Sequence, residues 1–174
     1  MGGHGEERSP ASPWSGCLRG RIGPCAMTSG RFPGEEEAGL NTAQQDLVRT
    51  TFARLAVMPE VAGALFYERL FAVNPDFRPL FKNDMRIQGV KLMTMIAMIV
   101  YNLPEPGQVL PAIRDLAVRH VDYGVKSADY DALREALLWT LEQALGDDCT
   151  PAVREAWTLC YDELAGEMKA AAGV

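Results

Sequence analysis

The sequence contains few of the residues from which most enzyme active sites are built. It has only two histidines among 174 residues, His4 and His120, and its four cysteines form no CxxC pair. Neither Cys149 nor Cys160 has a histidine at the spacing of a zinc site. A zinc centre and a disulfide framework are therefore not expected, and the cysteines are expected to be reduced thiols of a cytoplasmic protein.

Positive charge and long apolar runs are also scarce. The chain has 17 Lys and Arg against 23 Asp and Glu, a formal net charge of −6. Nucleic acid is not expected as a partner, because binding to phosphate backbones requires a basic face. The longest apolar stretch, 92–103, is too short to cross a bilayer, so no membrane span is expected.

The composition changes near residue 40. Residues 1–40 hold nine of the 16 glycines and four of the 11 prolines, without a helical or strand period. This composition predicts a disordered tail, and the early acids Glu6 and Glu7 argue against a secretory signal. A second interpretation is that Met27 is the true start and that the residues before it are not native. Residues 41–174 are expected to form a single domain.

From residue 41 onward the apolar residues recur with the helical period, with no signal for a β-hairpin or an internal repeat. The sequence predicts an all-α fold of six main helices and one short connector. The expected elements are a helix opened by a capping box of Thr42 and Gln45, a helix over 59–73, a connector over 76–81, a helix capped by Asn83 or Asp84 and ending near Tyr101, a helix over 108–121 with a stop at Gly124, a helix capped by Ser127, and a last helix opened by Thr150 and Pro151.

His120 is the one histidine of the predicted helical part, on an apolar helix face with Ile113, Leu116 and Ala117. By itself, such a histidine is more often a core residue with a satisfied hydrogen bond than a ligand. A neutral imidazole is also a good axial ligand for haem iron, and one is enough because the macrocycle supplies four nitrogens. The carbonyl of Leu116 or Ala117 lies within reach of the other ring nitrogen.

Five segments carry a recognisable pattern in a fixed order. They are LFYERLFAVNPDFRPLF (65–81), MRIQGVKLM (85–93), LAVRHVDYGV (116–125), DYDALREALLWTLEQALGD (129–147) and TPAVREAWTLCYDELA (150–165). Together they resemble the bacterial single-domain haemoglobins and the haem domain of flavohaemoglobins, over about residues 42–170. The resemblance implies a globin fold, with helices crossing obliquely around a pocket for haem b.

The resemblance also implies roles for individual residues. His120 would be the proximal iron ligand, and Phe81 would pack flat on the porphyrin. Tyr67 and Gln88 match the distal pair, whose hydroxyl and amide groups can donate hydrogen bonds to a gas ligand. Without the resemblance, they would be an ordinary helix aromatic and a solvated glutamine. The other matches are the distal contacts Leu92 and Ile96, the pocket residues Leu133, Leu137 and Tyr161, and the proximal tyrosine Tyr130.

Two basic residues and one missing acid complete the expected site. Arg119 is a candidate contact for a haem propionate. Lys91 has three open interpretations: a propionate contact, an iron ligand in a gas-free state, or a solvated side chain. Flavohaemoglobins place a glutamate near the end of the last helix, whereas this sequence has Ala172 there, and Glu167 is the nearest acid on a different face. The electron donation that such a glutamate gives to the proximal histidine is therefore not expected.

These features lead to three functional hypotheses. The first is a haem protein that reversibly binds O2, NO or CO, in oxygen transport or gas scavenging. The second is an enzyme, a nitric oxide dioxygenase using Tyr67 and Gln88 and a separate reductase, with weak peroxidase activity as a milder form. The third is a haem-free signalling or interaction module. A monomer or a homodimer is expected, and no FAD or NAD(P)H reductase segment follows residue 165 before Val174.

Overall fold

The computed structural model describes residues 39–82 and 84–173. Within this part the chain is all-α and contains no strand. The predicted tail, apart from Gly39 and Leu40, lies outside the described residues, as does the alternative cap Asn83. The α-helices are α1 (Thr42–Ala56), α2 (Pro59–Val73), α3 (Met85–Tyr101), α4 (Leu110–Asp122), α5 (Asp129–Leu145) and α6 (Pro151–Ala172).

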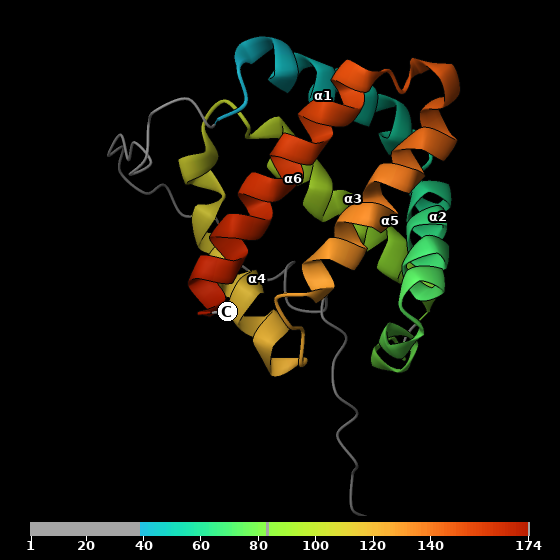
Figure 1. The fold of residues 1–174 in the computed structure, drawn as a ribbon, viewed down its shortest axis with the longest axis vertical. Coiled ribbons are helices and arrows are strands. Elements are labelled where there is room, and N and C mark those ends of the chain that lie inside the picture. Colours follow the sequence, from blue (N-terminus) through green and yellow to red (C-terminus); the bar gives the residue numbers. More distant parts are fainter. Residues whose placement is uncertain (1–38, 83, 174) are drawn as a thin grey trace, which may run out of the picture.

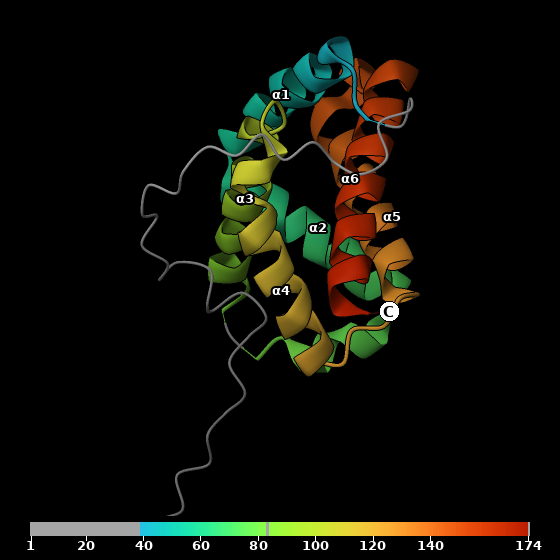
Figure 2. The same ribbon diagram turned by 90° about the vertical axis from the view of Figure 1, so that its left-hand side faces the viewer.

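The predicted fold class is confirmed. The expected connector is a 3₁₀ segment, η1 (Pro75–Leu80), and two further short 3₁₀ turns, η2 (Pro106–Gln108) and η3 (Gly146–Asp148), were not predicted. In Figure 1, α5 and α6 lie in front of α3, with α1 across one end of the molecule. Figure 2 shows α3 and α4 on one side of the molecule and α5 and α6 on the other.

Two predicted helix caps are wrong. The capping box of α1 is formed by Asn41 and Gln44, one residue earlier than the predicted pair Thr42 and Gln45. Leu40 fixes this register, because its backbone N donates a 3.1 Å hydrogen bond to the Glu163 carboxylate on α6.

Ser127 does not cap α5. The helix begins at Asp129, and its N-cap position, Ala128, makes no side-chain cap bond. The carboxylate of Asp129 instead accepts a 2.8 Å hydrogen bond from the backbone N of Lys126. The turn before α5 is therefore held by the side chain of the first residue of the helix, and not by a cap residue that precedes it. The predicted caps Asp84 and Thr150 are confirmed, since each accepts a hydrogen bond from a backbone N–H of its helix.

A large apolar cluster joins α1, α3, α5 and α6 and includes Phe52, Leu141 and Trp157. The indole Nε1 of Trp157 donates a 2.9 Å hydrogen bond to the hydroxyl oxygen of Thr51. This bond satisfies the one polar group that the largest core side chain brings inside, as buried indoles require. The cluster anchors the α1–α6 half of the fold.

Helices α2 and α3 cross in close backbone contact at Gly63 and Gly89. A Cβ atom built on Gly63 would lie 2.3 Å from Cα of Gly89, and one built on Gly89 would lie 3.1 Å from Cα of Gly63. Neither distance leaves room for a side chain between the two backbones. The crossing brings Tyr67, one turn beyond Gly63, close to the part of α3 that carries Gln88.

In Figure 1, α3 and α4 lie close together at the connection between them and spread apart toward the start of α3 and the end of α4. The short connection 102–109 joins them, and Met95 of α3 and Ile113 of α4 belong to the same buried cluster. Gln88 lies about two turns before Met95, and His120 lies about two turns after Ile113, so each is roughly 10 Å along its helix from the join. Gln88 and His120 therefore both lie toward the end at which α3 and α4 are farther apart.

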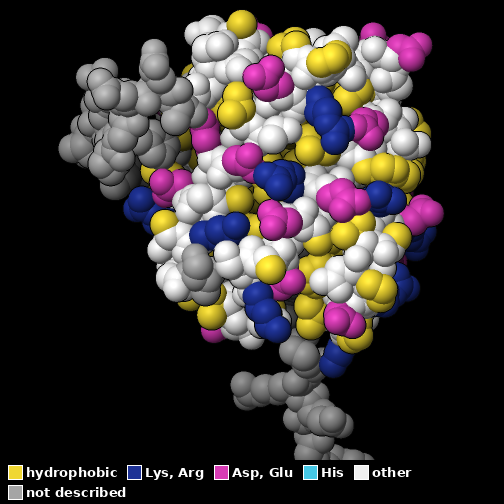
Figure 3. Space-filling view, in the orientation of Figure 1, with side chains coloured by type: hydrophobic (Ala, Val, Ile, Leu, Met, Phe, Trp, Pro, Cys, Tyr) yellow, Lys and Arg dark blue, Asp and Glu magenta, His cyan; other side chains and the backbone are white. Residues whose placement is uncertain are grey.

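The surface carries charges of both signs. On the face seen in Figure 3, basic and acidic side chains are interspersed rather than gathered by sign. Several of them are paired, such as Arg134 with Asp162 at 3.1 Å and Arg154 with Glu142. Within the part of the chain that the structure describes, no helix has the length and apolar character needed to cross a membrane.

Candidate functional site

The candidate site is built around His120, which lies in the last turn of α4 and is only 5% exposed. Its Nδ1 atom lies 2.8 Å from the carbonyl oxygen of Leu116, one turn earlier. Because a carbonyl oxygen can only accept, Nδ1 carries the hydrogen and Nε2 carries the lone pair. Of the two predicted acceptors, Leu116 is the one used, and it orients the ring with Nε2 as the metal-binding atom.

The protonation state of His120 also suits a ligand. Burial lowers the pKa of this imidazole, and the hydrogen bond to Leu116 offsets part of that effect. The ring is therefore neutral at pH 7, the form that coordinates metals. Just beyond it the chain turns at Gly124, whose φ of 82° is accessible to glycine without strain, and the N–H of Val125 donates to the carbonyl of His120 at 3.0 Å.

Tyr67 on α2 and Gln88 on α3 supply further buried polar groups. Tyr67 is 2% exposed and Gln88 is fully buried. Among the described residues, neither the amide nitrogen nor the amide oxygen of Gln88 has a hydrogen-bond partner. Leaving a buried amide unsatisfied costs about 1–3 kcal/mol. A ligand that pairs with this amide would remove the cost, so Gln88 has the environment of a binding residue rather than of a solvated one.

Apolar side chains surround this polar pair. The ring of Phe81 lies edge-on to Tyr67, with 5.1 Å between centroids. The structure places all the predicted distal and apolar contacts in one cluster with Tyr67: Phe81, Leu92, Ile96, Leu133 and Leu137. The cluster is drawn from α2, α3, α5 and the segment after η1. Residues that are distant in the sequence thus form one apolar wall.

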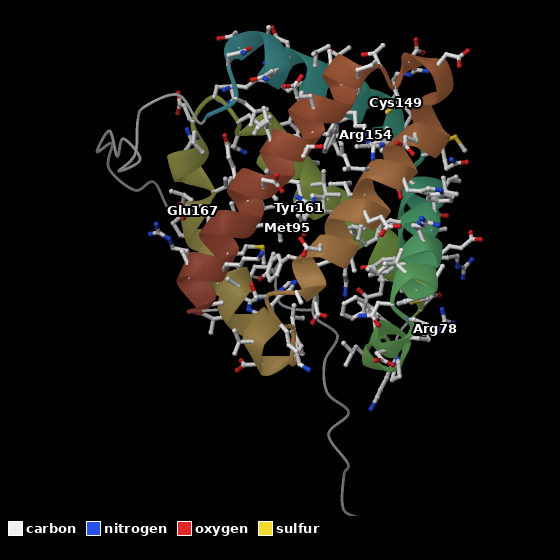
Figure 4. All side chains as sticks on the ribbon, in the orientation of Figure 1. Arg78, Met95, Cys149, Arg154, Tyr161 and Glu167 are labelled. Carbon is white, nitrogen blue, oxygen red and sulfur yellow. The ribbon has the colours of Figure 1, made fainter. Side chains whose placement is uncertain are left out.

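Tyr130 and Tyr161 lie on the side of His120. Both belong to the cluster that contains Leu116 and Ala117 of α4, and the Tyr161 hydroxyl donates a 2.7 Å hydrogen bond to the backbone oxygen of Tyr130. Figure 4 shows Tyr161 near the middle of the molecule, between α5 and α6. Burial raises the pKa of both phenols, so both stay protonated. The hydrogen bond that joins Tyr161 to Tyr130 is therefore made by uncharged groups.

The two basic candidates differ in their surroundings. One guanidinium nitrogen of Arg119, Nη1, is buried and has no hydrogen-bond partner among the described residues. Lys91 is half-buried on α3, and no carboxylate of the described residues lies within ion-pair distance. An acidic group from outside the protein would satisfy Arg119.

The sequence has no acid at the position of the flavohaemoglobin glutamate, and the nearest acid, Glu167, already pairs with an arginine. The carboxylate of Glu167 on α6, labelled in Figure 4, lies 3.5 Å from the guanidinium of Arg114 on α4. Ala172 packs against the cluster of Leu116 and Tyr130. On α6, the ammonium of Lys169 lies 5.2 Å from the ring centroid of Tyr130.

A comparison with known protein families identifies the family of this chain. Residues 64–168 match the family model for globins. The chain belongs to the globin family. The predicted resemblance is thus confirmed, and with it the expectation of a haem site, because globin domains bind haem.

The relatives of this globin include larger proteins. It is 29% identical over 122 residues to the flavohemoproteins of Bordetella parapertussis and Bordetella bronchiseptica. The match covers 68% of this chain but only 30% of each relative, so the chain spans less than a third of their length. A solved structure, an engineered carbene transferase built on a candidate nitric oxide dioxygenase of Rhodothermus marinus, superposes with a TM-score of 0.70 at 26% identity. That superposition covers 77% of this chain and 94% of that one.

The residues of this globin fit a haem. The imidazole of His120 on α4 is buried and neutral, the amide of Gln88 on α3 has no hydrogen-bond partner among the described residues, and Figure 1 shows the two helices spreading apart toward these residues. A single protein ligand suffices for an iron porphyrin. The groups that His120 and Gln88 supply are therefore those that a globin uses to bind haem and its ligand.

Sequence reasoning missed three residues of the site region. The pair Gly63 and Gly89 carried a signal, because glycine in the interior of a helix is unfavourable and usually has a packing reason. Lys169 carried no signal, since its position over Tyr130 depends on how α6 packs against α5.

Of the two described cysteines, Cys160 is buried, which raises the pKa of its thiol to about 12 and disfavours the reactive thiolate.

Proposed function

We propose that this globin binds haem b through Nε2 of His120 and uses the site to bind a diatomic gas reversibly, with O2 as the first candidate. The observation that carries the proposal is the unsatisfied, fully buried amide of Gln88. A haem-free module would gain nothing from burying this amide next to Tyr67 and would be more stable with an apolar residue there. No cysteine precedes His120 in its helix, so the haem would be held without a covalent link.

When bound, haem supplies an iron centre that coordinates the gas. Each protein residue then has a defined task. His120 would hold the iron, and its contact with Leu116 keeps the imidazole ring in a fixed orientation. Tyr67 and Gln88 would donate hydrogen bonds to the gas. The residues that would make apolar contacts to the porphyrin are Phe81, Leu92, Ile96, Leu133, Leu137 and Tyr161. Tyr130 would support the His120 side of the site, and Arg119 and Lys91 would pair with the propionates.

Gln88→Leu is expected to have opposite effects on stability and on gas binding. In the haem-free protein, removing an unsatisfied buried amide should raise the free energy of unfolding by about 1–3 kcal/mol. In the haem-loaded protein, losing a donor worth about 0.5–1.5 kcal/mol should speed O2 dissociation roughly two- to tenfold. Chemical denaturation and stopped-flow O2 release measure the two effects.

Gln143→Leu is the matched control, because Gln143 is exposed on α5. It should change the unfolding free energy by less than about 0.5 kcal/mol and leave O2 release unchanged. Tyr67→Phe should also speed O2 release. The proposal fails if Gln88→Leu and Tyr67→Phe both release O2 at the parent rate.

A second function, nitric oxide dioxygenase, is supported by the flavohemoprotein relatives and by the Rhodothermus marinus structure. In this reaction NO would be oxidised to nitrate at the oxygenated site, and an external reductase would return the iron to the ferrous state. The two functions differ in turnover. A dioxygenase should consume many equivalents of NO when an NADH-dependent reductase is supplied, whereas a gas carrier should consume about one equivalent and stop.

A further inference from the structure

The last turns of α6 carry a half-buried lysine whose charge is not paired. The ammonium of Lys169 lies 5.2 Å from the ring centroid of Tyr130, which is the distance of a cation–π contact. Within the described part of the chain, no carboxylate lies within 4.0 Å of this ammonium. The ring of Tyr130, which is only 3% exposed, therefore holds a positive charge at the edge of the buried interior.

The acids around Lys169 are either exposed to solvent or engaged with other groups. Asp115 and Asp122 of α4 are exposed, so water and salt screen their charges. The acids at the start of α5 and in the second half of α6 contact groups other than Lys169: Asp129 the backbone N of Lys126, Asp131 and Asp162 the guanidinium of Arg134, Glu163 the backbone N of Leu40, and Glu167 the guanidinium of Arg114. The charge of Lys169 is therefore not cancelled by a direct ion pair.

Lys169 lies at the same end of the molecule as His120. Figures 1 and 2 both show the last turns of α6 beside the last turns of α4, the helix that carries His120. Tyr130 belongs to the same buried cluster as Leu116, and the carbonyl oxygen of Leu116 lies 2.8 Å from Nδ1 of His120. This cluster is apolar, and a charge that acts across it is screened less than one that acts through water.

The sign of the charge decides which oxidation state of an iron held by His120 it favours. Oxidation of ferrous to ferric haem removes one electron and leaves one more positive charge on the iron. A fixed cation nearby repels that added charge and therefore favours the ferrous state. The ferrous state is also the one that binds O2 in the proposed function.

We propose that Lys169, held over Tyr130, biases the iron of a haem bound to His120 toward the ferrous, gas-binding state. This role rests on the proposed function, because it requires a haem held by His120. Lys169 acts through its charge and not as a ligand, and the contact with Tyr130 fixes the position of that charge. It is therefore a positioning residue of the site and not a catalytic one.

A redox titration of the full-length, haem-loaded protein, followed by its Soret band, tests this role. Lys169→Met keeps an apolar stem over Tyr130 but removes the charge. It should shift the ferric–ferrous equilibrium at least about twofold toward the ferric state, a fall of about 18 mV or more in midpoint potential. Lys169→Glu reverses the charge and should shift the equilibrium about fourfold or more, about 36 mV. Added salt should reduce both shifts, because Lys169 is only half-buried.

Two controls separate the charge of Lys169 from its packing and from the net charge of the protein. Lys169→Arg keeps the charge and should keep the parent midpoint potential. Arg49→Gln removes an exposed cation on α1 and should also leave the midpoint unchanged. The proposed role is wrong if Lys169→Met keeps or raises the midpoint, or if Lys169→Arg lowers it as far as Lys169→Met does.

The Soret band distinguishes a failure of this role from a failure of the proposed function. A parent protein that shows no Soret band after haem addition would overturn both. A parent with a normal Soret band, together with a Lys169→Met variant of the same midpoint potential, would overturn the role of Lys169 alone.

Discussion

Replacing His120 by glycine is expected to abolish tight haem binding, and added imidazole is expected to restore it. The variant removes Nε2, the lone pair that the contact between Nδ1 and Leu116 orients. No second histidine lies among the described residues. We expect haem transfer to a competing apo-globin to be faster by a factor of about 100 or more, since losing the one protein–iron bond removes several kcal/mol. The Soret band and the transfer rate are the measurements.

Imidazole separates ligand loss from structural damage. Glycine in a helix costs about 1 kcal/mol relative to alanine, and imidazole cannot restore that loss. Recovery of the Soret band with imidazole therefore shows that the lone pair, rather than the packing of α4, was removed. A variant that retains haem as tightly as the parent without imidazole would show that another residue is the ligand.

Gly63→Ala is expected to destabilise the protein by about 3 kcal/mol or more. The new Cβ would meet Cα of Gly89 at 2.3 Å and its carbonyl carbon at 2.7 Å. Both are backbone atoms, so no side chain can rotate away, and α2 and α3 must separate. Separation would also move Tyr67 relative to Gln88. Denaturant unfolding of the haem-free protein measures the loss of stability.

The other interior glycines provide graded controls. Gly89→Ala places its Cβ 3.1 Å from Gly63 and should cost less, about 1–3 kcal/mol. Gly166→Ala on α6 meets nothing within 4 Å and should stabilise the protein by about 0.5–1 kcal/mol, because alanine is the better helix former. Equal stability of the Gly63 and Gly166 variants would contradict the close crossing.

Helices could be predicted from the sequence because their signals are local. Pro59 and Val73 bound α2 as expected, and Thr150 caps α6 as expected. The error at α1 has an identifiable cause. Asn41 and Thr42 both have capping side chains, and each has a glutamine three residues later, so the local pattern fits either register. The contact between Leu40 and Glu163 decides between them, and it joins residues 123 positions apart.

The site was less accessible to sequence reasoning for the same reason. His120 and its carbonyl acceptor lie within one helical turn, so spacing alone indicated the pair. Gln88 has no local feature that marks it as buried, and it was singled out only by the resemblance to globins. Gln88 lies next to Gly89, whose close contact with Gly63 of α2 joins residues that are far apart in the sequence. Such long-range arrangements leave no periodic trace in a sequence.

Met95 of α3 and Ile113 of α4 belong to the same buried cluster. Beyond that cluster the two helices spread apart toward Gln88 and His120, each about two turns further along its helix. The angle between α3 and α4 therefore influences the width of the site. Side chains of the cluster such as Met95 and Ile113, which are not among the predicted ligand contacts, affect that angle, and the flexible thioether chain of Met95 can repack as it changes.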